Sequence, residues 1–202
     1  MENDIYTADC YCNIDGKSAF IRYKSVIAEL MIISQRIQLR YVDRAKLHRY
    51  GFKLADKLLN TRTLQSGHTQ YCVLSKITKH GYEYKDPELL AQCSHIIAVE
   101  DEYGAVANEL FTLIKNEAVS RKASVICCYN PFLQYSLERI ILPDSGVAVC
   151  RESSFCKPPV YDKRIHASRF CDNGLIKAHR QSLNFNNKII KELLPNCHQN
   201  SK

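Results

Sequence analysis

The sequence predicts an α/β protein in which helices cover a parallel sheet, with a helical segment added before it. From Tyr71 onward, short apolar runs alternate with amphipathic stretches, the order typical of strand, helix and strand units. The apolar runs are nearly continuous, as in strands buried on both faces of a parallel sheet. With 202 residues, 46% of them hydrophobic and 24% charged, the chain is long enough for one ordinary domain.

Residues 17–62 are predicted to form a basic helical arm. Apolar residues return in steps of three and four from Ile27 to Leu59, which marks one side of an α-helix. Lys and Arg fill much of the other side, and the segment carries eleven bases against three acids. We expect a long rod or a hairpin divided at Gly51, followed by a linker at 61–69. Residues 1–16 precede it as an acidic tail.

Residues 68–202 are predicted to form the main α/β domain, which ends in a C-terminal helix. The apolar runs HIIAV and SVICCY are the clearest buried strands. We expect strands at 71–74, 95–99, 124–129 and 147–150, a turn within 78–84, and helices at 87–93, 105–118, 132–141 and 175–194.

The composition also limits where the protein acts. No window reaches about 18 consecutive apolar residues, and the first residues are acidic, so neither a membrane span nor a secretory signal is predicted. We expect a cytoplasmic protein without a membrane partner. The ten cysteines are then expected to be reduced, and they do not form the two matched C-x2-4-C pairs of a structural zinc site.

A ligand of an open parallel sheet lies at the carboxyl ends of the strands. The first such crossing is the loop 100–109, EDEYGAVANE. A phosphate-binding loop needs glycines, a lysine and a Ser or Thr, whereas this loop has only Gly104 and none of the others. Four acids, Glu100, Asp101, Glu102 and Glu109, stand where a triphosphate would bind. The sequence therefore predicts a turn that repels anions.

Residues 68–150 resemble, in the order of their motifs, the second half of a family of duplicated P-loop ATPases from anaerobic Gram-positive bacteria whose role is unknown. The motifs that carry the resemblance are SKITKHGY, the strand HIIAV with its loop and helix, SVICCYNP and IILPDSGVAV. The resemblance implies a P-loop NTPase-like sheet. It also implies that 17–62 corresponds to the helical arm that ends a first repeat.

The loop departs from the family pattern at four positions. With Gly104 placed on the central glycine of the Walker A motif, Asp101 and Val106 occupy the two other glycine positions. Ala107 then occupies the lysine position and Asn108 the Ser/Thr position. The phosphate ligand, the magnesium ligand and two flexible backbone positions are thus replaced together, which predicts the loss of ATP hydrolysis and of tight ATP binding.

We therefore expect a pseudo-ATPase domain that is not an enzyme and acts as an interaction or regulatory module, with an intact ATPase as a candidate protein partner. The sequence leaves two alternatives open. One is a working ATP-binding protein or ATPase that holds ATP and magnesium without the lysine. The other is a nucleic-acid-binding accessory protein that uses the basic arm.

Three further features are weaker candidates for function. Asp144 precedes a strand, which favours a turn residue over a Walker B acid. Asn130 and Pro131 follow a strand and are placed at the ligand edge or in an ordinary turn. Cys127 and Cys128 are candidates for a nucleophilic dyad with a histidine, but the spacing selects no partner and adjacent strand residues are expected to point to opposite faces.

Overall fold

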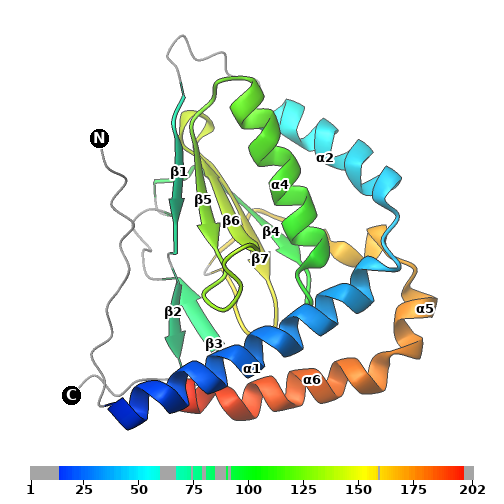
Figure 1. Cartoon of the computed structure of the whole chain (residues 1–202). Helices are drawn as coiled ribbons and strands as arrows, with labels where there is room; N and C mark the ends of the chain where they lie inside the picture. The colour runs from blue at the N-terminus through cyan, green and yellow to red at the C-terminus, as the bar shows by residue number, and fades with distance from the viewer. Residues whose placement is uncertain are drawn as a thin grey trace.

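A computed structural model describes residues 14–59, 67–73, 75–78, 81–84, 90, 92–158 and 160–197. Its centre is a six-stranded sheet with the order β1-β5-β6-β7-β4-β8 (Figure 1). These strands are β1 (Thr69–Cys72), β5 (Val125–Tyr129), β6 (Leu137–Leu142), β7 (Val147–Glu152), β4 (His95–Glu100) and β8 (Lys163–His166). A separate antiparallel pair is formed by β2 (Ser75–Thr78) and β3 (Gly81–Tyr84).

The sheet is mixed, and the prediction of a parallel sheet is wrong at one strand. β6 runs antiparallel to both β5 and β7, whereas β1 with β5, β7 with β4 and β4 with β8 are parallel pairs. Short connections join β5 to β6 and β6 to β7, and short connections produce antiparallel neighbours. The α/β class with flanking helices is confirmed.

The helix predicted at 132–141 is also wrong, because this segment contains a turn and then β6. Apolar residues in this stretch return at helical steps, but every residue of β6 is buried. A strand buried on both faces has no alternation of apolar and polar residues to distinguish it from a helix. The strands expected at 95–99, 124–129 and 147–150 and the helix expected at 105–118 are confirmed.

Five α-helices surround the sheet in the described part of the chain. They are α1 (Ile14–Leu39), α2 (Arg44–Leu58), α4 (Ala105–Ser120), α5 (Asn173–Ala178) and α6 (Arg180–Leu193), with short 3-10 helices at Pro143–Ser145, Ala167–Phe170 and Leu194–Cys197. The terminal helix predicted at 175–194 is therefore divided at His179, whose Nε2 lies 2.8 Å from the Tyr41 hydroxyl. None of these helices combines the length and apolar character needed to cross a bilayer.

The N-terminal segment forms two helices, and the break lies before Arg44 rather than at Gly51. Asp43 caps α2 by accepting a hydrogen bond from the Lys46 amide at 2.9 Å. Gly51 is buried inside α2, where a Cβ atom would lie 3.0 Å from a side-chain carbon of Leu113 in α4. Glycine thus permits close packing of α2 on α4.

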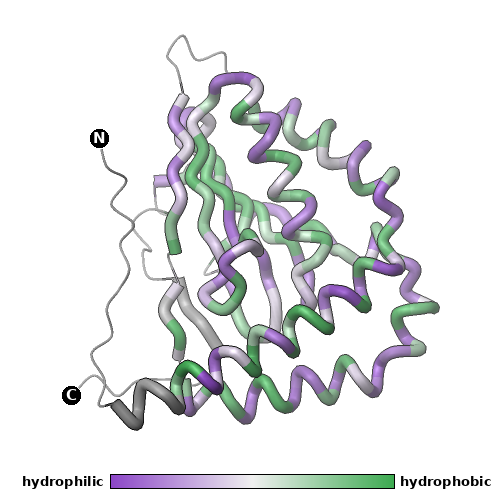
Figure 2. Tube along the Cα trace, viewed as in Figure 1, coloured by the Kyte–Doolittle hydropathy of each residue, from purple (hydrophilic) through white to green (hydrophobic). Residues whose placement is uncertain are grey.

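The core has three parts. α4 packs on one face of the sheet, and α2 contributes Leu47, Leu54 and Ala55 to the same cluster, which also contains Leu59 at the C-cap of α2. α1 and α6 lie side by side across the end of the sheet to which β5 and β7 point (Figure 1). A smaller cluster around Cys128, Ile141 and Cys150 covers the other face. Figure 2 shows hydrophobic residues concentrated in the central strands and a mixture of both kinds along the outer helices.

Some expected segments fall outside the described residues. They are the acidic tail apart from residues 14–16, most of the linker at 61–69, and most of the helix expected at 87–93. The turn expected within 78–84 corresponds to the β2 and β3 hairpin, whose connecting residues 79–80 are also not described.

Candidate functional site

The predicted crossing from strand to helix is present at the end of β4. β4 ends at Glu100, and α4 begins at Ala105 with Gly104 as its N-cap. Gly104 has a φ of 84°, a left-handed conformation that favours glycine. A Cβ atom there would lie 2.7 Å from the guanidinium carbon of Arg151. This position requires glycine for its backbone angle and for its close neighbour.

Two backbone amides at the start of α4, those of Ala105 and Ala107, are bonded to side chains of the protein. The Asp101 carboxylate accepts a hydrogen bond from the Ala107 amide at 2.8 Å. Gln38 of α1 accepts one from the Ala105 amide at 3.0 Å, and its own amide donates to Asp101 at 2.7 Å. Asp101 is only 1% exposed. Two of the amides that a phosphate would use at a helix N-terminus are thus occupied by a carboxylate and an amide oxygen of this chain.

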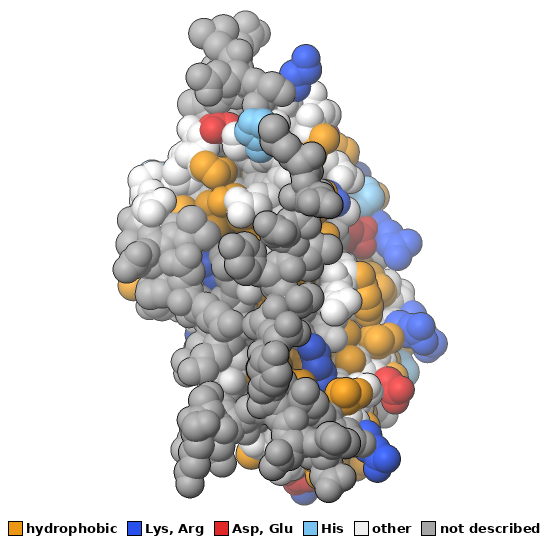
Figure 3. Space-filling view, turned by 60° about the vertical axis from the view of Figure 1, so that its left-hand side comes forward, with side chains coloured by type: hydrophobic (Ala, Val, Ile, Leu, Met, Phe, Trp, Pro, Cys, Tyr) orange, Lys and Arg blue, Asp and Glu red, His pale blue; other side chains and the backbone are white. Residues whose placement is uncertain are grey.

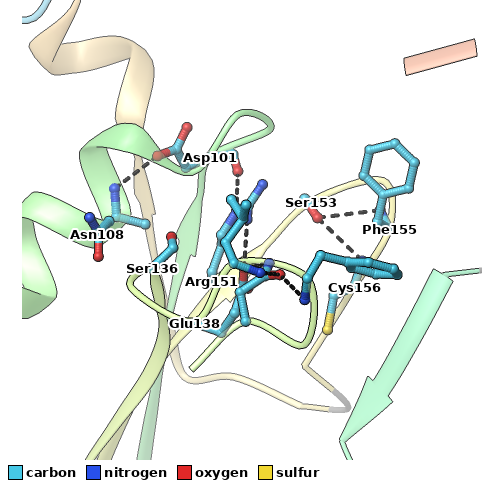
Figure 4. A network of polar contacts seen from close by, with 12 residues as sticks. Asp101, Asn108, Ser136, Glu138, Arg151, Ser153, Phe155 and Cys156 are labelled. Carbon is cyan, nitrogen blue, oxygen red and sulfur yellow. Dashed lines mark hydrogen bonds and ion pairs between the residues drawn. The ribbon is translucent and has the colours of Figure 1, made fainter. Parts of the chain in front are cut away.

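Arg151 of β7 forms hydrogen bonds with the backbone of the loop between β4 and α4. Its guanidinium donates to the carbonyl of Asp101 at 2.8 Å and to that of Glu102 at 2.7 Å (Figure 4). It also forms a 2.7 Å ion pair with Glu138 of β6, and both side chains are less than 5% exposed. The loop therefore turns two carbonyl groups toward an internal cation.

Asn130 extends this network at the end of β5. Its side-chain oxygen accepts the amides of Phe132 at 2.7 Å and Leu133 at 3.0 Å, and its nitrogen donates to Glu138. Asn130 thus lies at the expected edge of the sheet. These contacts stabilise the turn between β5 and β6, because buried backbone amides need hydrogen-bond partners.

The other predicted positions of the loop, Val106, Ala107 and Asn108, are buried or half-buried. Val106 and Ala107 are fully buried in the main core. Asn108 is half-buried, and its side-chain oxygen accepts the Leu137 amide at 2.9 Å. A lysine at position 107 would enter the core rather than extend over a bound phosphate. The five predicted site residues are brought together, but as structural groups.

The four acids of the loop have separate partners. Glu100 contacts His166, Glu102 accepts the Ser154 amide at 2.8 Å, and Glu109 lies 2.7 Å from His48. Asp101 points inward to the helix amides. The expectation that the loop repels anions stays a prediction; the structure adds that Asp101 and Gln38 occupy two amides at the start of α4.

The local electrostatic environment still disfavours negative charge. The pKa of Tyr103 is raised by burial and further by Glu102 and Asp101. Burial raises the pKa of the Cys171 thiol to about 11, and Asp101 contributes to the same shift. Both groups therefore stay neutral near pH 7 beside the loop.

Helices α1 and α6 cover the edge of the sheet where a nucleotide would be expected. Ile27 and Met31 of α1 pack with Phe132, Phe155 and other apolar residues into one buried cluster. The cavity left between Met31, Glu102, Arg151, Phe155 and neighbouring side chains has a volume of about 10 Å³. This is about the space of one water molecule, whereas ligand pockets measure about 300–1,000 Å³.

A larger groove lies on the outer flank of α4, between α1 and α2. Its volume is about 880 Å³, and its lining combines apolar and charged side chains. Arg36, Arg44, His48, Phe52, Glu109 and Tyr135 are among them. Arg44 lies 3.6 Å from Glu109 across the groove. Ala105 and Asn108 also line this groove.

The other sequence candidates have structural roles. Asp144 lies in the turn before β7, and its carboxylate accepts the Ser124 amide at 2.8 Å. Cys127 belongs to the core beneath α4 and Cys128 to the cluster on the other face, as the strand pattern predicts. Within the described residues, no group of three His, Cys, Asp or Glu side chains is arranged to hold a metal ion.

Sequence reasoning missed Gln38, Glu138 and Arg151, which complete the network. A signal for two of them was available, because the otherwise apolar runs LERIIL and VAVCRE contain four charged residues, Glu138, Arg139, Arg151 and Glu152. Buried charges are normally paired, so charges of opposite sign in neighbouring strands indicate an ion pair, but not which acid pairs with which base. Gln38 had no comparable signal, since a glutamine in a long helix is ordinarily exposed.

Comparison of the chain with protein-family models, with curated proteins and with solved structures found no match.

Proposed function

We propose that this protein is a catalytically degenerate P-loop NTPase-like domain that acts as an interaction or regulatory module. The observation that carries the proposal is the closure of the β4 to α4 crossing by the chain's own side chains. Asp101 and Gln38 bond the first amides of α4, and α1 and α6 cover the same edge of the sheet.

A nucleotide would have to break several contacts at once to bind there. It would displace the Asp101 carboxylate from the Ala107 amide and the Gln38 amide from Asp101. It would also need to separate α1 from the turn at Phe132 and Leu133, because the remaining cavity is about 10 Å³. No lysine or hydroxyl side chain lies at positions 107 and 108 to compensate for these losses.

The exposed surface of α1 and α2 supports the interaction part of the proposal. Eight of the bases in this segment are exposed: Arg22, Arg36, Arg40, Arg44, Lys46, Arg49, Lys53 and Lys57. On the face shown in Figure 3, the Lys and Arg side chains stand apart from one another, with hydrophobic, acidic and histidine side chains near them. Spaced charges beside apolar side chains suit an acidic protein surface, such as that of an intact ATPase, since rim charges steer association.

The proposal is tested by isothermal titration of the full chain with ATP and magnesium. We expect no saturable heat at millimolar nucleotide. The Asp101→Asn variant keeps the side-chain shape and removes the negative charge, and we expect the same result because Gln38, α1 and α6 still close the site. Sulfate at similar concentration serves as a second probe, and we expect no binding by either protein.

Saturable binding of ATP by the wild-type chain would overturn the proposal. If such binding occurs, Gln38→Ala and Arg44→Glu locate it, because the first changes the loop and the second changes the groove beside α4. Binding of sulfate by Asp101→Asn alone would contradict the closure argument, since it would leave charge repulsion as the sole barrier.

A further inference from the structure

Three cysteines and a buried arginine form a row across the face of the sheet opposite α4. In the strand register, Cys72 of β1 pairs with Cys128 of β5, Cys128 with Arg139 of β6, and Arg139 with Cys150 of β7. Residues that pair in register point to the same face of a sheet. Cys128 and Cys150 belong to the same small cluster, and Cys72 packs against it.

Cys72 and Cys128 are close enough to react with each other. Their sulfur atoms lie 3.5 Å apart, although 56 positions of sequence separate the residues. Adjacent strands lie about 4.8 Å apart, within the Cα separations of about 4.4–6.8 Å that disulfides bridge. β1 is the edge strand of the six-stranded sheet, and β5 is its neighbour there. Bringing the two sulfurs together therefore involves this one pair of strands.

The two thiols differ in access. Cys72 is half-buried, whereas Cys128 is 2% exposed. A reagent in solution therefore reaches Cys72 first, and Cys128 is positioned behind it. This is the arrangement of an attacking and a resolving thiol, in which the second cysteine displaces whatever the first has bound.

The surroundings also favour the thiolate at Cys72. Its pKa is lowered first by the hydrogen bond with the Cys128 thiol and also by the charge of Arg139, against the opposing effect of burial. The pKa of Cys128 is raised, first by its bond to Cys72 and then by burial, while Arg139 lowers it. A cation beside a thiol is a recurrent feature of reactive cysteines.

We propose that Cys72 and Cys128 form a redox-active pair that closes to a disulfide when the protein meets a low-molecular-weight disulfide such as oxidised glutathione. The inference is independent of the proposed function, because it concerns the opposite face of the sheet.

The reaction proceeds in two balanced exchanges. The Cys72 thiolate attacks one sulfur of oxidised glutathione, the bond between the two glutathione sulfurs breaks, and one glutathione thiolate leaves and takes up a proton. Cys128 then loses its proton and attacks the Cys72 sulfur, and the second glutathione leaves as a thiolate that is protonated. Two protein thiols are oxidised, and one glutathione disulfide is reduced to two thiols.

The first exchange prepares the second. Once Cys72 is bonded to glutathione, it no longer carries the negative charge that helped Cys128 keep its proton. The charge of Arg139 remains and favours the Cys128 thiolate. Deprotonation of Cys128 is therefore easier in the mixed disulfide than in the reduced protein.

The test is incubation of the native full chain with oxidised glutathione, followed by blocking of free thiols and mapping by mass spectrometry. Trypsin places Cys72 in the peptide 63–76, whereas Cys127 and Cys128 share the peptide 123–139. We expect these two peptides to be joined by a disulfide and Cys72 to be lost to alkylation.

Matched variants of the two neighbouring cysteines assign the partner. Cys127→Ala should keep the cross-link, because Cys127 points into the core beneath α4. Cys128→Ala should instead accumulate glutathione bound to Cys72, and Cys72→Ala should give neither product. The proposal is overturned if Cys128→Ala still forms the cross-link, if Cys72 joins another cysteine, or if the cross-link forms only in urea.

Discussion

The side-chain amide of Gln38 in α1 donates a 2.7 Å hydrogen bond to the carboxylate of Asp101 at the end of β4. The same Gln38 accepts the first amide of α4 from Ala105. One glutamine therefore ties the N-terminal helix to the loop between β4 and α4. It links the closure of this loop to the packing of α1 over the edge of the sheet.

Replacing Gln38 by Ala should destabilise the protein by about 2 kcal/mol, because a buried carboxylate oxygen and a helix amide lose their partner. Urea denaturation followed by circular dichroism measures this change. Gln35→Ala is the matched control on the same helix, since Gln35 makes one longer bond of 3.3 Å to Ser136. Equal effects of the two changes would contradict the role given to Gln38.

Breaking the buried ion pair between Arg151 and Glu138 should have a larger effect. Arg151→Met leaves the Glu138 carboxylate buried beside Asn130 without its cation, at an expected cost of about 3–5 kcal/mol. The double variant Arg151→Met with Glu138→Leu should recover part of this stability, because no uncompensated charge remains. Additive losses in the double-mutant cycle would show that the two side chains do not act as a pair.

Glycine is predicted to be required at position 104 because of its positive φ and because of the nearby Arg151 guanidinium. A comparison with Gly146 distinguishes these two effects. Gly104→Ala meets both an unfavourable φ and the Arg151 guanidinium, so we expect a loss of about 2–3 kcal/mol. Gly146 also has a positive φ, of 62°, but its nearest neighbour is the Ser94 hydroxyl at 3.0 Å. Gly146→Ala should therefore cost less in thermal or urea unfolding. If Gly104→Ala lowers the stability no more than Gly146→Ala does, the Arg151 side chain moves aside at little cost.

The reactivity of Cys72 should depend on pH in a way that reports its partner. Because the Cys128 thiol lowers the pKa of Cys72, the thiolate of Cys72 is present at lower pH in the wild type than in Cys128→Ala. As the pH is raised, the rate of alkylation of Cys72 by iodoacetamide should therefore begin to increase at a lower pH in the wild type than in Cys128→Ala. Cys197, whose pKa is raised to about 11 by burial, should react later. Coincident pH profiles for Cys72 in the two proteins would remove this argument.

The sequence predicted the fold best where its patterns were unambiguous. The run HIIAV and the helix after Gly104 were placed because a buried strand, a turn glycine and a helical period follow one another. The sequence wrongly predicts a helix at 132–141 because β6 is buried on both faces, which removes the alternation that identifies a strand. Without a strand at this position, the sequence predicts a parallel sheet.

The candidate site shows the same division. The absence of a lysine and of Ser or Thr near Gly104 is local information that the sequence states directly. The inward turn of Asp101 is not local, because it depends on Gln38 in another helix and on Arg151 in another strand. Contacts between distant segments decided whether the four acids form a patch or are paired separately.

The most direct test of the central claim observes the amides of Ala105 and Ala107 by nuclear magnetic resonance while ATP and magnesium are added. The closed loop predicts that both resonances keep their positions at millimolar nucleotide, because their hydrogen bonds to Gln38 and Asp101 persist. A saturable shift of these two resonances would contradict the account, since it would place an anion at the start of α4.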